Sequence, residues 1–185
     1  MFTLWLTGLP CSGKSTLAEA VADELTRRKR PVQLLDGDIV RRQWPSGLGF
    51  SKQDRDENVR RIVFGCRLLN AHGVAAIVAV IAPYRALRDE ARASIPGFLE
   101  VYVNASIETC IKRDVKGLYK KALAGEIPDF TGIGSPYEPP LRPELVIDTE
   151  REGPADSVAR ILAELEARSL IQAQRALTTT DPPML

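Results

Sequence analysis

The segment that most constrains the fold of this chain is a glycine-rich loop near its N-terminus. The residues GLPCSGKST (8–16) match the pattern G-x-x-x-x-G-K-[ST], directly after the apolar run TLWLT and before a helical pattern of Leu17, Val21 and Leu25. In this setting the glycines allow backbone N–H groups to surround phosphate oxygens, and the following helix adds its positive N-terminal end. A glycine-rich turn that matched by accident would need neither the strand nor the helix. We therefore expect a phosphate-binding loop between a first strand and a first helix.

The side chains of this loop have different expected roles. Lys14 should reach the β- and γ-phosphates of a nucleoside triphosphate, and Ser15 should bind Mg²⁺. Cys11 occupies a variable position of the pattern, so we interpret it as a small loop residue rather than a redox switch. The candidate nucleotide contacts of the loop are Gly8, Pro10, Cys11, Ser12, Gly13, Lys14, Ser15 and Thr16.

Five apolar runs rich in β-forming residues recur along the chain. They are TLWLTG, VQLLDG, VAAIVAVIAP, FLEVYVN and ELVIDT, with helix-like stretches between the first four. Such an alternation is typical of a parallel sheet covered on both faces, and it predicts a doubly wound α/β domain. A length of 185 residues suits one domain of this kind.

The composition excludes several other classes of protein. A hydrophobic share of 44% and a charged share of 26% are those of an ordinary soluble domain, and the net charge of +1 gives no broad attraction to nucleic acid or membrane. Three widely spaced cysteines without a CxxC pair argue against a disulfide framework or a zinc site. The N-terminal apolar run is too short for a signal peptide or a membrane span. We predict a cytoplasmic protein with no nucleic-acid or membrane partner.

The third quarter of the chain interrupts the α/β pattern. Residues 113–143 contain many Lys, Gly and Pro residues, and an irregular connection of this length is usually functional or disordered. We interpret it as a mobile lid. A closing helix is predicted from Pro154 to Ile171, so the domain should span residues 1–171 and leave residues 172–185 as a disordered tail.

Two acidic residues end the second apolar run, in LLDGDIVR. Asp36 and Asp38 should lie at the carboxyl edge of the sheet, where open α/β folds bind their ligands. A carboxylate there could orient an acceptor hydroxyl and receive its proton, and Asp38 is our candidate. Alternatively, Asp38 caps the following short helix and Asp36 sits in a turn. The run VAAIVAVIAP ends without an acid, so Mg²⁺ should depend on Ser15, water and Asp36 or Asp38.

The charged stretch GLGFSKQDRDENVRR (47–61) combines an outer, solvated face with an inner one. Ser51 and Asp54 resemble a capping box, and Gly73 offers a stop, so a helix is predicted over residues 52–71. Its apolar stripe carries Arg55 and Asn58 inward, where each needs a partner. That partner is either a bound anion or an internal salt bridge, for example from Arg55 to Asp38. Phe50, just before the helix, either stacks on a base or fills the core.

Several of these segments together resemble the adenylylsulfate (APS) kinase family. The matching stretches are GLPCSGKST, LDGDIVR, GLGFSKQDRDENVRR, RDVKGLYKKALAGEIPDFTGIGSPYE and PELVIDT. The resemblance implies a P-loop NTPase-type three-layer sandwich with a mostly parallel five-stranded sheet and a mobile lid. The implied reaction is phosphorylation of APS by ATP at the ribose 3′-hydroxyl, giving ADP and 3′-phospho-APS, with Mg²⁺ as cofactor.

The resemblance also implies roles for individual residues. Asp38 would be the catalytic acid near the ribose 3′-hydroxyl, and Lys116 would help to bridge the two substrates. Arg113 would lie against the ATP adenine. The implied APS contacts are Asp38, Arg41, Phe50, Arg55, Asn58, Ile81, Lys116 and Phe130, in which Phe50 and Phe130 sandwich the APS adenine and Ile81 contributes its backbone. The family further suggests a homodimer and a possible link to ATP sulfurylase.

Two departures from the family pattern affect the mechanism. Ala82, in IAPY, stands where many relatives have serine, so a phosphoserine intermediate at this position is impossible and direct in-line transfer is predicted. Gly134 stands where relatives often have aspartate, so the sequence does not identify the residue that makes the closing contact of the lid. Two other functions compete: another small-molecule P-loop kinase, and a non-catalytic sensor of APS or its product, although the intact phosphate loop argues against a sensor.

Overall fold

The computed structural model describes residues 1–43, 49 and 51–172 of the chain. Five parallel strands form one sheet in the order β2-β3-β1-β4-β5. Their bounds are β1 Thr3–Thr7, β2 Val32–Asp36, β3 Ala75–Ala79, β4 Phe98–Asn104 and β5 Leu145–Asp148. Each strand falls within one of the apolar runs, which confirms the predicted α/β fold.

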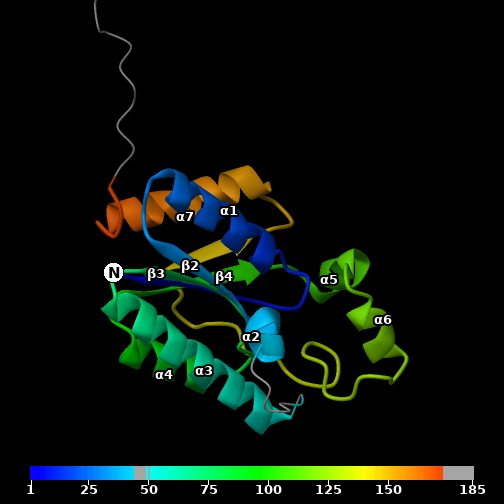
Figure 1. Cartoon of the computed structure of the whole chain (residues 1–185). Coiled ribbons are helices and arrows are strands. Elements are labelled where there is room, and N and C mark those ends of the chain that lie inside the picture. The colour runs from blue at the N-terminus through cyan, green and yellow to red at the C-terminus, as the bar shows by residue number, and fades with distance from the viewer. Residues whose placement is uncertain (44–48, 50, 173–185) are drawn as a thin grey trace, which may run out of the picture.

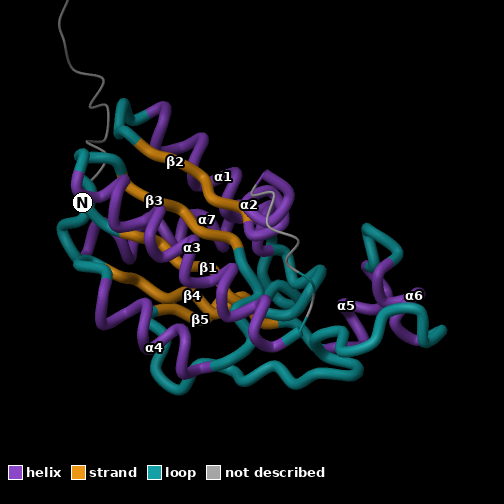
Figure 2. Tube along the Cα trace, turned by 60° about the horizontal axis from the view of Figure 1, so that its bottom comes forward, coloured by secondary structure: helices purple, strands orange, loops and turns teal. Residues whose placement is uncertain are grey.

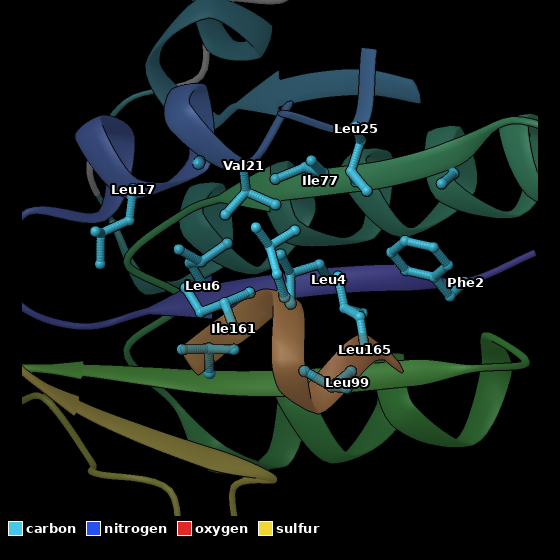
Figure 3. Packing of buried hydrophobic residues seen from close by; sticks show 14 of the residues in the cluster. Phe2, Leu4, Leu6, Leu17, Val21, Leu25, Ile77, Leu99, Ile161 and Leu165 are labelled. Carbon is cyan, nitrogen blue, oxygen red and sulfur yellow. The ribbon is translucent and has the colours of Figure 1, made fainter. Parts of the chain in front are cut away.

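Four long helices cover the two faces of the sheet (Figure 1). Helices α1 (Lys14–Arg27) and α7 (Pro154–Ala167) lie on one face, and α3 (Lys52–Ala71) and α4 (Arg85–Ser94) lie on the other. Because side chains of a strand point alternately to its two faces, the central strand β1 supplies both cores. Leu4 and Leu6 pack with Val21 and Ile161 of α1 and α7, as Figure 3 shows, whereas Trp5 belongs to the opposite cluster. These are the three layers that the sequence predicts.

Helix α3 agrees with its prediction residue for residue. Ser51 accepts a hydrogen bond from the backbone N–H of Asp54, and the Asp54 carboxylate accepts from the backbone N–H of Ser51, which together make the capping box. At the other end, Gly73 turns the chain with φ 78. Helix α7, in contrast, ends at Ala167 rather than at Ile171, because Ser169 adopts a left-handed conformation and reverses the chain.

Three shorter helices stand near the carboxyl ends of the strands: α2 (Gly37–Gln43), α5 (Ile107–Arg113) and α6 (Leu118–Leu123). Figure 2 shows them at the end of the sheet where the connecting loops meet. Helix α6 lies within the connection that the sequence marks as irregular. The Asp114 carboxylate accepts hydrogen bonds from the N–H groups of Tyr119 (2.9 Å) and Lys120 (3.0 Å), and this starts the helix without an apolar pattern. Among all the helices of the described residues, long and short, none is long and apolar enough to cross a bilayer.

Candidate active site

A cavity of about 580 Å³ opens at the carboxyl edge of the sheet. Its wall combines residues from the phosphate loop, α2, α3, the segment after β3 and residues 113–143, which we call the lid segment. The predicted site residues that line it are Pro10, Cys11, Gly13, Lys14, Ser15, Thr16, Asp36, Asp38, Arg41, Arg55, Asn58, Ile81, Arg113, Lys116 and Phe130. Gly8 and Ser12 are not in this lining, and Phe50 lies outside the described residues.

Gly8 and Ser12 shape the loop instead of facing the cavity. A Cβ atom at Gly8 would lie 2.3 Å from the carbonyl oxygen of Val103, so only glycine fits against β4. Ser12 is fully buried, and its carbonyl oxygen accepts a hydrogen bond from the Thr149 hydroxyl (2.9 Å). The loop is therefore held from both sides, by β4 and by the segment after β5.

Lys14 is almost enclosed, with 8% of its surface exposed. Its ammonium donates to the carbonyl oxygen of Leu9, at 2.7 Å, across the loop. Burial lowers the pKa of Lys14 to about 8, because a charged group loses its hydration there. A bound phosphate would place a full negative charge beside the ammonium in place of the Leu9 carbonyl and would raise the pKa of Lys14 again.

The two acids after β2 have different tasks. The Asp36 carboxylate accepts from the N–H groups of Asp38 (2.9 Å) and Ile39 (3.3 Å), and it also accepts from the Ser15 hydroxyl (2.9 Å). Asp36 therefore caps α2, which corrects the alternative that assigned the cap to Asp38. The Ser15 hydroxyl and the Asp36 carboxylate are hard oxygen donors of the kind that Mg²⁺ prefers, so this pair fits the predicted metal.

The Asp38 carboxylate is contacted by the lid segment. The Lys116 ammonium lies 2.5 Å from Asp38 Oδ2, and both side chains are more than half exposed. The hydrogen bond with Asp38 raises the pKa of Lys116. The predicted catalytic carboxylate and the predicted bridging lysine thus lie side by side at the cavity.

Arg55 and Asn58 are buried on the inner face of α3, as the helical pattern predicts. The Arg55 guanidinium donates to the Thr131 hydroxyl and to the Asp129 carbonyl oxygen, so it joins α3 to the lid segment. Asn58 is only 4% exposed, and its Oδ1 atom has no hydrogen-bond partner among the described residues. A buried amide oxygen of this kind needs a donor, which a polar ligand in the cavity can supply.

Aromatic and backbone groups complete the acceptor side of the cavity. The Phe130 ring packs edge-on against Tyr119, with ring centroids 5.0 Å apart. The Ile81 carbonyl oxygen accepts from the Thr7 hydroxyl (2.6 Å). Ala82 has a left-handed backbone (φ 40) and is 1% exposed, and its carbonyl oxygen accepts from the Arg88 guanidinium (2.5 Å). Its methyl group offers no hydroxyl to the cavity.

Sequence reasoning missed the segment after β5. Thr149, Glu152, Pro154 and Ser157 also line the cavity. Thr149 holds Arg113, which donates to its hydroxyl (2.9 Å) and to its carbonyl oxygen (2.7 Å). The available signal was positional, because loops at the carboxyl ends of parallel strands gather at the ligand-binding edge.

Known proteins resemble this chain over most of its length. The family profile described as Adenylylsulphate kinase matches residues 1–148. An adenylyl-sulfate kinase from Gloeothece citriformis is 55% identical over 164 residues, which cover 89% of this chain and 93% of that protein. The Mycobacterium tuberculosis APS kinase CysC, solved in complex with AMPPNP and APS, is 38% identical with a TM-score of 0.85, over 89% of this chain and 97% of that one. A probable bifunctional SAT/APS kinase 2 from Sorangium cellulosum is 53% identical over 165 residues, or 89% of this chain but 28% of that protein.

Proposed function

This chain belongs to the adenylylsulphate kinase family, and from that membership and its site we propose that it transfers the γ-phosphoryl group of ATP to the 3′-hydroxyl of APS. The products are ADP and 3′-phospho-APS. The observation that carries the proposal is that a phosphate loop, a carboxylate and two buried side chains, one cationic and one an amide, line the same cavity: Lys14, Asp38, Arg55 and Asn58. A phosphoryl donor and an anionic acceptor can meet there across Asp38.

The residues present divide the cavity into two ends. The phosphate loop and Arg113 form the donor end, where Lys14 leaves the Leu9 carbonyl and binds the β- and γ-phosphates. Arg55 and Asn58, from α3, form the acceptor end and bind the phosphosulfate or ribose of APS. Phe130 offers a flat face to the APS adenine.

Asp38 carries out the proton transfer. Its carboxylate orients the 3′-hydroxyl and receives the proton while the 3′-oxygen bonds to the γ-phosphorus and the bond to the β,γ-bridging oxygen breaks. The electron pair of the broken bond remains on ADP. Lys116, which contacts Asp38, is placed to stabilise the negative charge that passes between the two nucleotides.

Mg²⁺ is the proposed cofactor, and Ser15 with Asp36 would hold it, directly or through water. When bound, the ion neutralises charge on the β- and γ-phosphates. The lid segment is bound by Arg55 of α3 and contacts Asp38 through its own Lys116, so it closes over the cavity. In this position it excludes the water that would hydrolyse ATP.

A steady-state assay of ADP release tests the proposed acceptor. We expect turnover with APS at least about 100-fold more efficient than with a sugar or a nucleoside, because of these three only APS carries an anionic group that Arg55 can bind. Equal efficiency with a sugar would favour another small-molecule kinase, and nucleotide binding without any turnover would favour a sensor.

Direct transfer is part of the proposal, because Ala82 cannot be phosphorylated. Incubation with γ-labelled ATP should leave no acid-stable label on the protein. A labelled phosphoenzyme that passed its phosphate to APS would contradict direct transfer but not the overall reaction.

The homodimer, the link to ATP sulfurylase and the cytoplasmic location remain predictions from the family resemblance and composition. Light scattering of the purified chain measures its mass in solution and so tests the predicted homodimer.

A further inference from the structure

A small third cluster of apolar side chains lies apart from the two main cores, where the lid segment meets the phosphate loop. Helices α5 and α6, which supply several of its members, lie together beyond the carboxyl ends of the strands (Figure 1). The lid segment is thus packed against the loop that binds the donor phosphates. The members of the cluster are the buried residues Ala105, Cys110 and Tyr119 and the partly buried residues Leu9, Cys11, Ile107, Ile111 and Phe130.

Tyr119 connects α6 to the phosphate loop through its hydroxyl group. The side chain is fully buried, and the hydroxyl donates to the carbonyl oxygen of Pro10 at 3.2 Å. Among the described residues, no other donor reaches this carbonyl. A hydroxyl buried among apolar side chains is unfavourable unless it is hydrogen-bonded, so this bond favours one position of α6 relative to the loop.

The backbone of the lid segment also lies directly on the phosphate loop. A Cβ atom at Gly132 would lie 3.1 Å from Cδ2 of Leu9 and 3.2 Å from Cδ1 of Ile107, so the backbone approaches this closely because it carries no side chain there. Leu9 also supplies the carbonyl oxygen to which Lys14 donates. The lid segment and the phosphate-binding lysine therefore both contact residues 9 and 10 of the loop.

Two side chains that line the cavity depend on the position of α6. Lys116 comes two residues before the helix, and its ammonium lies 2.5 Å from Asp38 Oδ2. Phe130 meets the Tyr119 ring at 81°, with ring centroids 5.0 Å apart, and this T-shaped contact fixes the plane of the Phe130 ring.

We propose that Tyr119 is a positioning residue: its hydroxyl bond to Pro10 holds the lid segment in place over the cavity. From this position Lys116 reaches Asp38, and Phe130 lines the acceptor end. The effect of Tyr119 on catalysis rests on the proposed function, whereas its effect on the lid segment does not.

Loss of the hydroxyl bond should let α6 separate from the loop more often. Because a helix of six residues is unstable alone, its backbone hydrogen bonds open whenever it separates. Water then enters the cavity, and ATP is hydrolysed where it would otherwise phosphorylate the acceptor.

Hydrogen exchange of the ligand-free protein tests the effect on the lid segment. Tyr119→Phe keeps the ring and removes only the hydroxyl, so we expect the amides of α6 to exchange about 10-fold faster than in the wild-type chain. Because no nucleotide is present, this result does not depend on whether APS is the acceptor.

Product analysis tests the effect on catalysis. We expect the ratio of ADP to 3′-phospho-APS to rise at least about 3-fold in Tyr119→Phe, since more ATP is lost to water. The Kd for ATP should stay within about 2-fold, because Lys14 and the N–H groups of the loop are unchanged. A general loss of stability would lower both products together and would leave their ratio unchanged.

Tyr102→Phe is the matched control. Tyr102, on β4, does not line the cavity; its ring stacks on Tyr137 with centroids 6.0 Å apart, and among the described residues its hydroxyl has no hydrogen-bond partner. The control should keep the wild-type exchange of α6 and the wild-type product ratio.

Unchanged exchange of α6 in Tyr119→Phe would overturn the proposal. Faster exchange with an unchanged product ratio would overturn the positioning role, because Tyr119 would then act on structure alone. Failure of the proposed function would show differently, as a wild-type chain that forms no 3′-phospho-APS whatever its exchange rates.

Discussion

Two residues at the cavity already have partners within the protein, and both partners must give way to substrate. Lys14 donates to the Leu9 carbonyl, and Asp38 accepts from Lys116. Neither contact follows from a motif, since the motif states which residue types occur and not which atoms meet. The roles that the sequence predicts for these two residues are therefore compatible with the structure. The free energy needed to exchange each internal partner for substrate depends on burial and on distances that only the fold defines.

The lowered pKa of Lys14 predicts a pH dependence of ATP binding. Only the ammonium form pairs with phosphates, and burial lowers its pKa to about 8. As pH rises through about 8, ATP affinity should fall by roughly tenfold per pH unit, until the higher pKa of the complex is reached. A fluorescence titration from pH 7 to pH 9.5 measures this. AMP is the control, because it lacks the β- and γ-phosphates and should show no such fall; Lys14→Ala should lose ATP binding.

Removal of the Asp38 charge should affect chemistry more than binding. Asp38→Asn keeps the size of the side chain but cannot accept the proton, so we expect kcat with APS to fall by about 10²- to 10⁴-fold while the Kd for ATP changes little. Single-turnover kinetics separate the two effects. Asp23→Asn, an exposed change of the same kind on α1, should leave kcat unchanged. A fully active Asp38→Asn enzyme would remove Asp38 from the mechanism.

At the scale of elements, α3 is both a core helix and a wall of the site. Its bounds and its inward face could be predicted from the sequence because a capping box, a stop and a 3.6-residue period are local signals. The choice between an anion and a salt bridge for Arg55 could not, since it depends on the lid segment, 74 and 76 residues further along the chain. Helix α6 was missed for a related reason: it is short, and a side chain outside it starts it.

Arg55→Ala should weaken the acceptor end selectively. The substitution removes both the contacts from α3 to the lid segment and the guanidinium proposed to bind APS, so we expect the KM for APS to rise by about 10-fold or more with the Kd for ATP nearly unchanged. Arg60→Ala on the outer face of the same helix is the control, because Arg60 is exposed and pairs only loosely with Glu90 (3.5 Å). An equal rise in both variants would indicate a general effect on α3.

At the scale of the molecule, the parallel sheet and its two covering layers follow from strand pattern and from the preference for parallel strands with crossover helices. The strand order β2-β3-β1-β4-β5 was not predicted and comes from the structure. The loop between β5 and α7 shows the limit of such reasoning, because nothing in its composition marks Glu152 or Ser157 as site residues.

One buried side chain on α4 connects β4, the segment after β3 and the lid segment. Arg88, 2% exposed, donates to Glu100 of β4 (2.8 Å), to the Ala82 carbonyl and to the Glu138 carbonyl (2.5 Å).

Loss of Arg88 should therefore destabilise the whole domain. Arg88→Ala leaves the Glu100 carboxylate buried without this partner, and we expect the free energy of unfolding to fall by about 3–5 kcal/mol. Urea denaturation followed by circular dichroism measures the change. In the control Arg168→Ala, which removes a partly exposed pair with Glu164 within one helix turn, the loss should stay below about 1 kcal/mol. Similar values for the two variants would mean that the Arg88 network adds little to stability.

The alanine at position 82 has a stereochemical consequence. One displacement at phosphorus inverts its configuration, whereas passage through a protein-bound phosphate would require two displacements and would restore it. A γ-phosphate made chiral with oxygen isotopes should therefore emerge on the 3′-oxygen with the opposite handedness.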